Sequence, residues 1–563
     1  MNALSKRALW LLPGAIVLFF PMRVAPANGQ QSAVAADSSS ASAASSDPLL
    51  QAMREELERS KSQLKMENVP APYYIEYHLW DLDEYDAEAA FGALRFEQRS
   101  HGRSLRVVVR VGDYKQDSYY PPGMGAVNIA PVDNDPIALR WQLWIATDQA
   151  YKAASQALAM KKAAMREYTN DQPFDDFAHA PAVQSIEPLA KLDFDSQPWR
   201  DALESSTALF RTDPKIESLT ARLQFRAVNR YFVNTEGTVT REGYAGYFLN
   251  ALGSTQAADG MRLERSPYFA AAAARDLPTP EHFHAEVAKM VATLKSLREA
   301  PVVDEDYRGP VLFSPDAASD VFNGLVGANI LGVRPKPGDS ARTLGEYASN
   351  YKSRVLPSFL SVEDDPTAKT FEGKTLVGSY DTDDDGVRAV KVPVIKDGLL
   401  VNYLLGREPI RDFPESNGHG RAGPSQFTTP SIGNLIVESK QALSPDQLKE
   451  KLIQLCRDDG KQFGYFVDTL GGPGYEPRLL YRVYQDGREE LVRGAVFDEL
   501  DTRALRNELV AAGNDLLVQN REAAVPTTVI SPSILFDDLE VKRTDAKNAK
   551  LPEYPPPDLS SSR

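Results

Sequence analysis

The sequence predicts an α+β protein in which an N-terminal helix-and-antiparallel-sheet domain precedes a mostly β C-terminal domain. An amphipathic helical pattern is followed by short runs rich in Tyr, Phe and Val, a succession typical of α+β domains. The part of the chain between its low-complexity ends, about residues 47–543, is too long for one ordinary hydrophobic core. We therefore predict two domains, over residues 47–300 and 301–543.

The chain begins with the features of a secretory signal peptide. Lys6 and Arg7 give a positive start, residues 8–22 form an apolar run, and a small-residue cleavage site ends at Ala27. We predict that residues 1–27 are removed and that the protein is exported, to the periplasm or outside the cell. A retained anchor is the alternative, but the run is shorter than the ~20 residues that a spanning helix needs. No later run is apolar enough to cross a bilayer, so we expect no membrane span in the mature protein.

Two segments have the composition of disordered chain. Residues 28–46 are rich in Ser and Ala, and residues 544–563 are rich in Pro. Such segments bury too little apolar surface to offset the entropy of ordering. We predict a flexible tether before the first domain and a disordered tail after the second.

Charge and cysteine content exclude several classes of function. The formal net charge is −15, and no basic cluster offsets it, so nucleic-acid binding is disfavoured. The single cysteine, Cys456, excludes an intrachain disulfide. Because Leu448 and Leu452 share its helical face, we predict a buried core thiol rather than a nucleophile or metal ligand. Phosphate-loop, dinucleotide and G-x-S-x-G motifs are absent from the sequence.

The N-terminal domain combines predicted helices and strands. A helix over 47–66 places Leu50, Met53 and Leu57 on one face. The other predicted elements are strands at 73–82, 88–98 and 103–112, a helix at 135–168, strands at 219–235 and 239–250, and a helix at 279–298. Asn234-Thr-Glu-Gly237 supplies a turn between the last two strands.

The second domain contains local signals of its own. Ser444 is a good helix N-cap, and Gln447 three residues later closes a capping box. Lys396-Asp-Gly398 separates two apolar runs and predicts a hairpin turn. A helix is expected over 319–330, after an apolar strand.

Four groups of segments in this domain resemble, in order, the TldD/PmbA metallopeptidase family. They are 309–318; 378–387 with 394–404; 416–421 with 434–437 and 444–448; and 512–516 with 526–539. The first resembles the strand that leads into the family's key helix, and the second resembles its acidic strand and turn. The resemblance covers about 240 residues and implies a peptidase-related function.

The sequence departs from the family at its zinc motif. Active members resemble zinc peptidases with H-E-x-x-x-H on a helix, where two imidazoles hold zinc and the Glu is a general base. The corresponding helix here has Asn323, Gly324 and Ala328 at these positions, and it contains neither His nor Glu. We therefore predict no catalytic residue and no cofactor in this chain. Zinc would enter only through an active partner subunit or through relocated ligands.

Two other groups of residues could suggest a metal. His282 and His284 are two residues apart on a predicted helix, so they do not share a face. The acidic turn Asp383-Asp384-Asp385-Gly386 belongs to a run that copies the first half of a calcium loop. Its twelfth position is Val392 instead of the bidentate Glu. We expect an acidic turn in which Gly386 adopts positive φ, with calcium binding as the alternative.

The segment 416–421 supplies the peptide-binding candidates. The family resemblance implies that this turn lies close to the cleft, which makes Asn417, His419 and Arg421 candidates for contact with a peptide. The alternative is a solvated histidine in a flexible turn.

Three functions remain open from the sequence. The first is a non-catalytic partner of the PmbA/TldE type, which binds peptide or unfolded polypeptide beside a homologous TldD-type subunit. The second is an active metallopeptidase with relocated zinc ligands. The third is a stand-alone binding or scaffold protein of the cell envelope.

Overall fold

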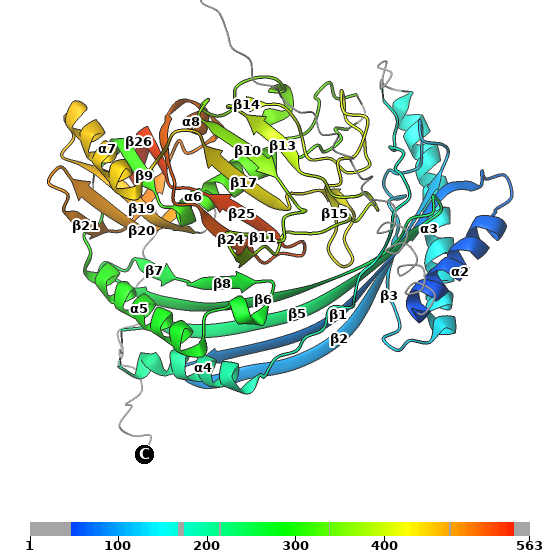
Figure 1. Cartoon of the computed structure of the whole chain (residues 1–563), viewed down its shortest axis with the longest axis horizontal. Helices are drawn as coiled ribbons and strands as arrows, with labels where there is room; N and C mark the ends of the chain where they lie inside the picture. The colour runs from blue at the N-terminus through cyan, green and yellow to red at the C-terminus, as the bar shows by residue number, and fades with distance from the viewer. Residues whose placement is uncertain are drawn as a thin grey trace, which may run out of the picture.

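The computed structural model describes residues 47–166, 174–212, 215–303, 305–336, 338–471 and 475–544. The predicted signal peptide, the tether and all of the predicted tail except Thr544 lie outside these ranges. The α+β class is confirmed: a large, mainly antiparallel sheet with helices precedes a domain built mainly of strands (Figure 1). Within the described ranges, no helix combines the length and the apolar character that crossing a membrane requires.

Four long strands form the body of the N-terminal domain. The eight-stranded sheet has the order β3-β2-β1-β5-β6-β4, with β7 and β8 both paired to β6. Their bounds are β1 Pro72–Ala90, β2 Ala93–Val111, β3 Ala126–Ile129, β4 Gln184–Ile186, β5 Ser218–Asn234, β6 Val239–Gln256, β7 Arg262–Arg265 and β8 Tyr268–Ala271.

The predicted strands at 73–82, 88–98 and 103–112 are in fact one long hairpin. β1 continues to Ala90 and β2 begins at Ala93, with Phe91 and Gly92 between them at φ 51° and 79°. Two consecutive positive φ values are typical of the tight turns whose twist matches a hairpin. The polar stretch 81–86 does not break β1, because its neighbours in β2 and β5 pair with it along its length.

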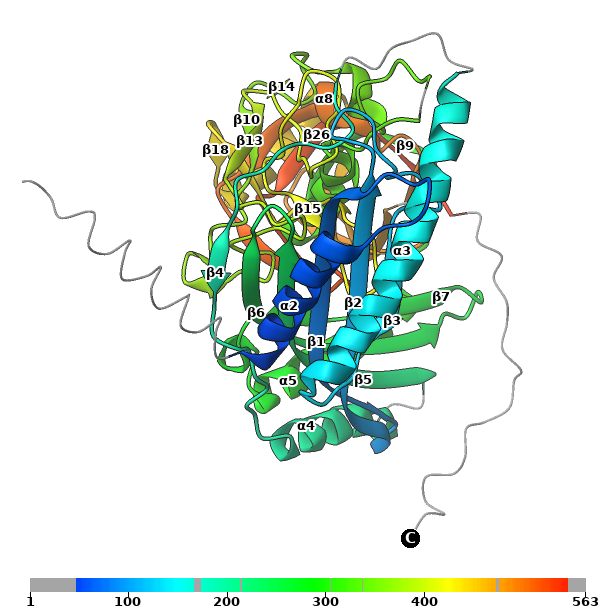
Figure 2. The same cartoon turned by 90° about the vertical axis from the view of Figure 1, so that its right-hand side faces the viewer.

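Helices cover the two ends of this sheet. Helices α2 (Pro48–Gln63) and α3 (Pro136–Met165) begin at the aspartate caps Asp47 and Asp135 and cross one end side by side (Figure 2). At the other end lie α4 (Gln197–Thr207) and α5 (Pro280–Glu299). Each pair buries its apolar face against the sheet and forms a separate hydrophobic cluster.

Two mixed sheets make up the C-terminal domain. One has the order β14-β13-β10-β17-β25-β24, and the other has the order β18-β23-β26-β9-β19-β20-β21 with β22 paired to β26. The bounds are β9 Tyr307–Phe313, β10 Leu360–Asp364, β13 Val392–Lys396, β14 Leu399–Leu400, β17 Asn434–Ser439, β18 Ala442–Leu443, β19 Phe463–Gly471, β20 Glu476–Tyr484, β21 Glu489–Val492, β22 Ala495–Phe497, β23 Leu509–Gly513, β24 Leu517–Arg521, β25 Thr527–Ser531 and β26 Ile534–Arg543. Two short hairpins complete it: β11 (Thr370–Phe371) with β12 (Lys374–Thr375), and β15 (Gly420–Arg421) with β16 (Thr429–Pro430).

Several local predictions for this domain are confirmed. The capping box of Ser444 and Gln447 starts α7 (Pro445–Asp458), and Cys456 on that helix is buried. Asp397 and Gly398 form the predicted turn at φ 52° and 78°. The remaining helices are α6 (Pro315–Val321) and α8 (Thr502–Asn507).

The two domains meet along the curved sheet. Strands β1, β2, β5 and β6 bend beneath the C-terminal domain, which lies against their concave side (Figure 1). Polar side chains cross this junction, including an ion pair between Arg230 on β5 and Asp384. The junction is therefore the place where residues far apart in the sequence are brought together.

Candidate functional site

The helix that corresponds to the family's zinc-motif helix follows β9. Ser314 caps it by accepting a hydrogen bond from the amide of Ala317 at 3.1 Å. After α6 the backbone widens into a π-helical stretch, Phe322–Val326, in which the amide of Gly327 bonds to the carbonyl of Phe322. This stretch contains positions 323 and 324.

The motif positions do not form a metal site. Gly324 and Ala328 offer no ligand atom, and Asn323 offers only an amide, whereas zinc takes several nitrogen, sulfur or carboxylate ligands. A Cβ at position 324 would also overlap the hydroxyl of Tyr475. The phenol occupies the space next to the helix, so zinc does not fit these residues.

Carboxylates lie at the start of this helix instead of imidazoles. Burial raises the pKa of Asp316 to about 6, and the nearby charges of Asp320 and Asp468 add to the effect. Arg521 donates to Asp320 at 2.7 Å and to Ser319 at 2.8 Å. These contacts fix the helix start to β24.

The acidic turn is folded into the domain junction. Asp383 accepts hydrogen bonds from the amides of Asp385 and Val387, and its other oxygen accepts from Gly420. Gly386 has φ 77°, as predicted. These hydrogen bonds from backbone amides to the carboxylate of Asp383 hold the turn in shape.

Asp384 joins the two domains. Its carboxylate accepts from Arg230 at 2.8 Å and from Arg421 at 3.1 Å, and it is 4% exposed. Burial alone would raise the pKa of Asp384, but the two guanidinium groups outweigh it and lower that pKa to about 2. Asp384 is therefore ionised at any physiological pH.

The three peptide-binding candidates lie in different environments. His419 is fully buried, and its Nε2 lies 3.2 Å from Asp364, so the expectation of a solvated histidine in a flexible turn is wrong. Gly418, at φ 75°, turns the chain inward at this point. The amide group of Asn417 is used by the backbone of Leu405 and Tyr403. Arg421 lines a cavity.

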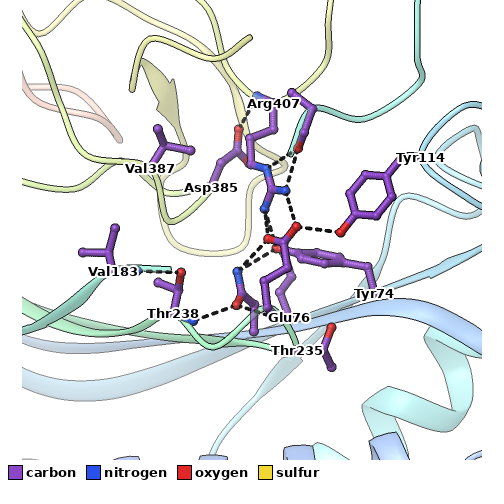
Figure 3. Close-up of polar contacts among 12 residues, drawn as sticks. Tyr74, Glu76, Tyr114, Val183, Thr235, Thr238, Asp385, Val387 and Arg407 are labelled. Atoms are coloured by element: carbon purple, nitrogen blue, oxygen red, sulfur yellow. Dashed lines mark hydrogen bonds and ion pairs between the residues drawn. The ribbon is translucent and has the colours of Figure 1, made fainter. Parts of the chain in front are cut away.

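A second arginine clamps the junction and was not predicted from the sequence. Arg407, labelled in Figure 3, is 1% exposed. It forms a two-armed pair with Glu236 at 2.7 and 2.8 Å. It also donates twice to the carbonyl of Ala178, and its guanidinium lies over the ring of Phe177 at 3.9 Å. Tyr114 donates to the same glutamate.

A cavity of about 320 Å³ opens between the domains. One wall is formed by β6 and the residue after β4, and the other by the segment around β11 and β12 together with Arg421. Glu187 and Glu242 line it, and Asp381 joins them in a group whose carboxylate oxygens lie within 4.8 Å of one another. Burial raises the pKa of Glu187 to about 7, reinforced by its contact with Asp381.

Comparison with known proteins agrees with this architecture. Residues 306–543 match the model of the PmbA/TldA metallopeptidase C-terminal domain. The metalloprotease PmbA of Escherichia coli O157:H7 is 28% identical over 192 residues, which are 34% of this chain and 39% of that protein. A metalloprotease of Archaeoglobus fulgidus is 29% identical over 119 residues, 21% of this chain and 24% of the relative. The C-terminal domain, residues 306–543, belongs to the TldD/PmbA family.

Solved structures extend the likeness to both domains. TldE from Thermococcus kodakarensis has a TM-score of 0.57 at 14% identity, covering 87% of this chain and 99% of that one. A Thermotoga maritima protein described as a modulator of a DNA gyrase has a TM-score of 0.59 at 15% identity, with the same coverage. These structures show that the TldD/PmbA fold includes the curved sheet. The sequence matches span well under half the length of the curated relatives.

Proposed function

We propose that this chain is an exported, non-catalytic subunit of the PmbA/TldE type that binds peptide or unfolded polypeptide and acts in proteolysis with a TldD-type subunit. The proposal rests on the helix that corresponds to the family's zinc-motif helix, because it offers neither the ligands nor the space for zinc. Gly324 and Ala328 supply no ligand, and Tyr475 occupies the space next to Gly324. The family resemblance supplies the role of a member without the motif.

An exposed apolar surface supports the proposal that this chain binds a partner subunit. Ile129 at the end of edge strand β3 is 83% exposed, and Ile137, Trp141 and Trp144 on α3 are 58%, 58% and 46% exposed. We call these four residues the α3 patch. Exposed apolar clusters with a polar rim mark sites of protein association, and Arg140 lies in the rim. We assign the α3 patch to the contact with the TldD-type subunit.

The test measures zinc and cleavage on one sample of the mature chain. We expect less than about 0.1 zinc per chain and no cleavage of an unfolded peptide by this chain alone. Adding the homologue that carries H-E-x-x-x-H should give cleavage faster than that homologue alone. A homologue purified without this chain is the control.

The other functions predict different outcomes. About one zinc per chain, with cleavage that a chelator abolishes, would show relocated ligands and overturn the proposal. No zinc and no effect on the homologue would favour a stand-alone protein of the cell envelope.

A further inference from the structure

The interdomain cavity has a wall of excess negative charge. Glu242 pairs with Arg230 and accepts the amide of Asp381. Lys369 lies 3.1 Å from Asp381 and 3.9 Å from Glu187, but its side chain is 63% exposed. Glu187 therefore has no buried cation of its own within this group. A positively charged group entering the cavity would meet Glu187 in its wall, with the carboxylate of Asp381 beside it and the exposed Lys369 nearby.

The facing wall has buried hydrogen-bond donors that lack an acceptor. Arg421 is 5% exposed and lies over the ring of Tyr380 at 3.8 Å, and its Nη1 atom has no hydrogen-bond partner. On the wall of Glu242, Nε of Arg230 likewise has no hydrogen-bond partner. A buried N–H without an acceptor costs free energy, of the order of 1–3 kcal/mol. Both side chains line the cavity, so an oxygen atom of a ligand there would satisfy a donor that the protein leaves free.

The carboxyl group of Glu187 holds a proton more tightly than an ordinary glutamate. Burial and the neighbouring carboxylates raise its pKa to about 7, so the group favours a positive charge next to it at neutral pH. A ligand with one ammonium group would supply the positive charge that this proton supplies.

From these observations we propose that the cavity binds the amino-terminal end of a peptide. The carboxylates of Glu187 and Asp381 would hold the α-ammonium group, and Arg421 would donate to the first carbonyl oxygen. The volume, about 320 Å³, is at the lower end of small-molecule sites, ~300–1,000 Å³. The buried apolar side chains of Leu376 and Val377 line the rest and suit a small side chain. This inference rests on the proposed peptide-binding function and names the part of the peptide that is bound.

The experiment uses trialanine and N-acetyl-trialanine with the full mature chain in calorimetric titrations at pH 7.5. We expect trialanine to bind at least tenfold more tightly than the acetylated peptide. Glu187→Gln should weaken trialanine binding at least tenfold. Glutamine keeps the shape of the protonated side chain, so this variant should fold. Glu489→Gln, which removes an exposed carboxylate that pairs with Lys449, is the matched control and should bind like the parent.

A second variant makes the result independent of any loss of folding. Lys369→Ala removes the competing cation and should tighten trialanine binding severalfold. Equal binding of both peptides, no binding at 10 mM, or no response to either Glu187→Gln or Lys369→Ala would overturn the inference. Saturable calcium binding that Glu187→Gln abolishes, without peptide binding, would overturn it in favour of a cation site. The zinc content and the effect on the homologue are measured separately from these titrations. Each of the two proposals can therefore fail without the other.

Discussion

The hydroxyl of Tyr475 and the α-carbon of Gly324 lie so close that no side chain fits between them. Tyr475 directly precedes strand β20, and Gly324 lies in the π-helical stretch after α6. The contact links two elements of the C-terminal domain at the position where relatives resemble zinc peptidases. Position 324, which corresponds to the glutamate of the zinc motif, therefore serves the packing of Tyr475 in this chain.

Gly324→Ala tests this contact. The added methyl group must displace the phenol, so we expect the free energy of unfolding in urea to fall by about 1–3 kcal/mol. The double variant Gly324→Ala, Tyr475→Ala should be more stable than the sum of the two single changes predicts, because it removes the overlap. Gly102→Ala on β2, where a Cβ meets nothing within 4 Å, is the control and should change stability little. Additive effects in the double variant would contradict this account.

Arg407→Ala should weaken the domain junction. It leaves Glu236 half-buried without its cation and the carbonyl of Ala178 without its donors, so we expect a loss of about 3–5 kcal/mol in urea unfolding. Arg308→Ala removes an exposed pair with Asp538, which solvent screens, and should change stability much less than Arg407→Ala does. Equal effects of the two changes would show that the junction does not depend on the clamp.

The α3 patch predicts where the partner binds. Replacing Trp141 and Trp144 by serine should weaken association with the TldD-type homologue at least tenfold, since buried tryptophans often dominate interface energies. Leu252→Ser removes an apolar side chain that is 40% exposed on β6 and is the control. Binding is measured by sedimentation velocity. Unchanged association of the tryptophan variant would place the contact elsewhere.

Glu408 predicts a dependence of stability on pH. Burial raises its pKa to about 7, even though Arg110 and Arg334 act in the opposite direction. A raised carboxyl pKa stabilises the fold below the unfolded value and loses that effect as pH rises through about 7. Glu408→Gln should therefore raise the melting temperature at pH 8 and leave it nearly unchanged at pH 4.5. The exposed Glu415→Gln should have no such pH-dependent effect. A gain at pH 4.5 as large as at pH 8 would refute the assignment.

Export predicts the first residue of the mature protein. If the signal peptide is cleaved after Ala27, intact mass and N-terminal sequencing of the exported protein should show a chain that begins at Asn28. Ala27→Arg should block this cleavage, because the signal peptidase site accepts small residues. An exported protein that still begins at Met1 would contradict the prediction.

Local chemistry made many elements predictable from the sequence. The caps and turns at Ser444 and Gly398 depend on neighbouring residues, and the structure confirms them. The periodicity of apolar residues also predicted α2, α3 and α5, since each of these helices buries one apolar face. The long hairpin was missed because the polar middle of β1 is stabilised by pairing on both sides, which no local pattern records.

The residues of the junction could not be found in the same way. Arg407 and Glu236 are 171 residues apart, and only the folded chain brings them together. Arg230 did give a signal: it stands in the run Asn229-Arg-Tyr-Phe-Val233, and a charged residue within a buried strand needs a partner. The sequence could not say that this partner is Asp384. His419 likewise gave no sign of burial, because its partner Asp364 lies 55 residues away.

The π-helical stretch, Phe322–Val326, has a backbone spacing that suits a pair of metal-binding side chains. Its hydrogen bonds span five residues, the same spacing that separates positions 323 and 328. A backbone with this spacing places two such positions almost one above the other, as a pair of metal-binding imidazoles requires. The main chain of this stretch therefore suits a metal-binding motif that its side chains do not supply, and the phenol of Tyr475 fills the space that a side chain at position 324 would need.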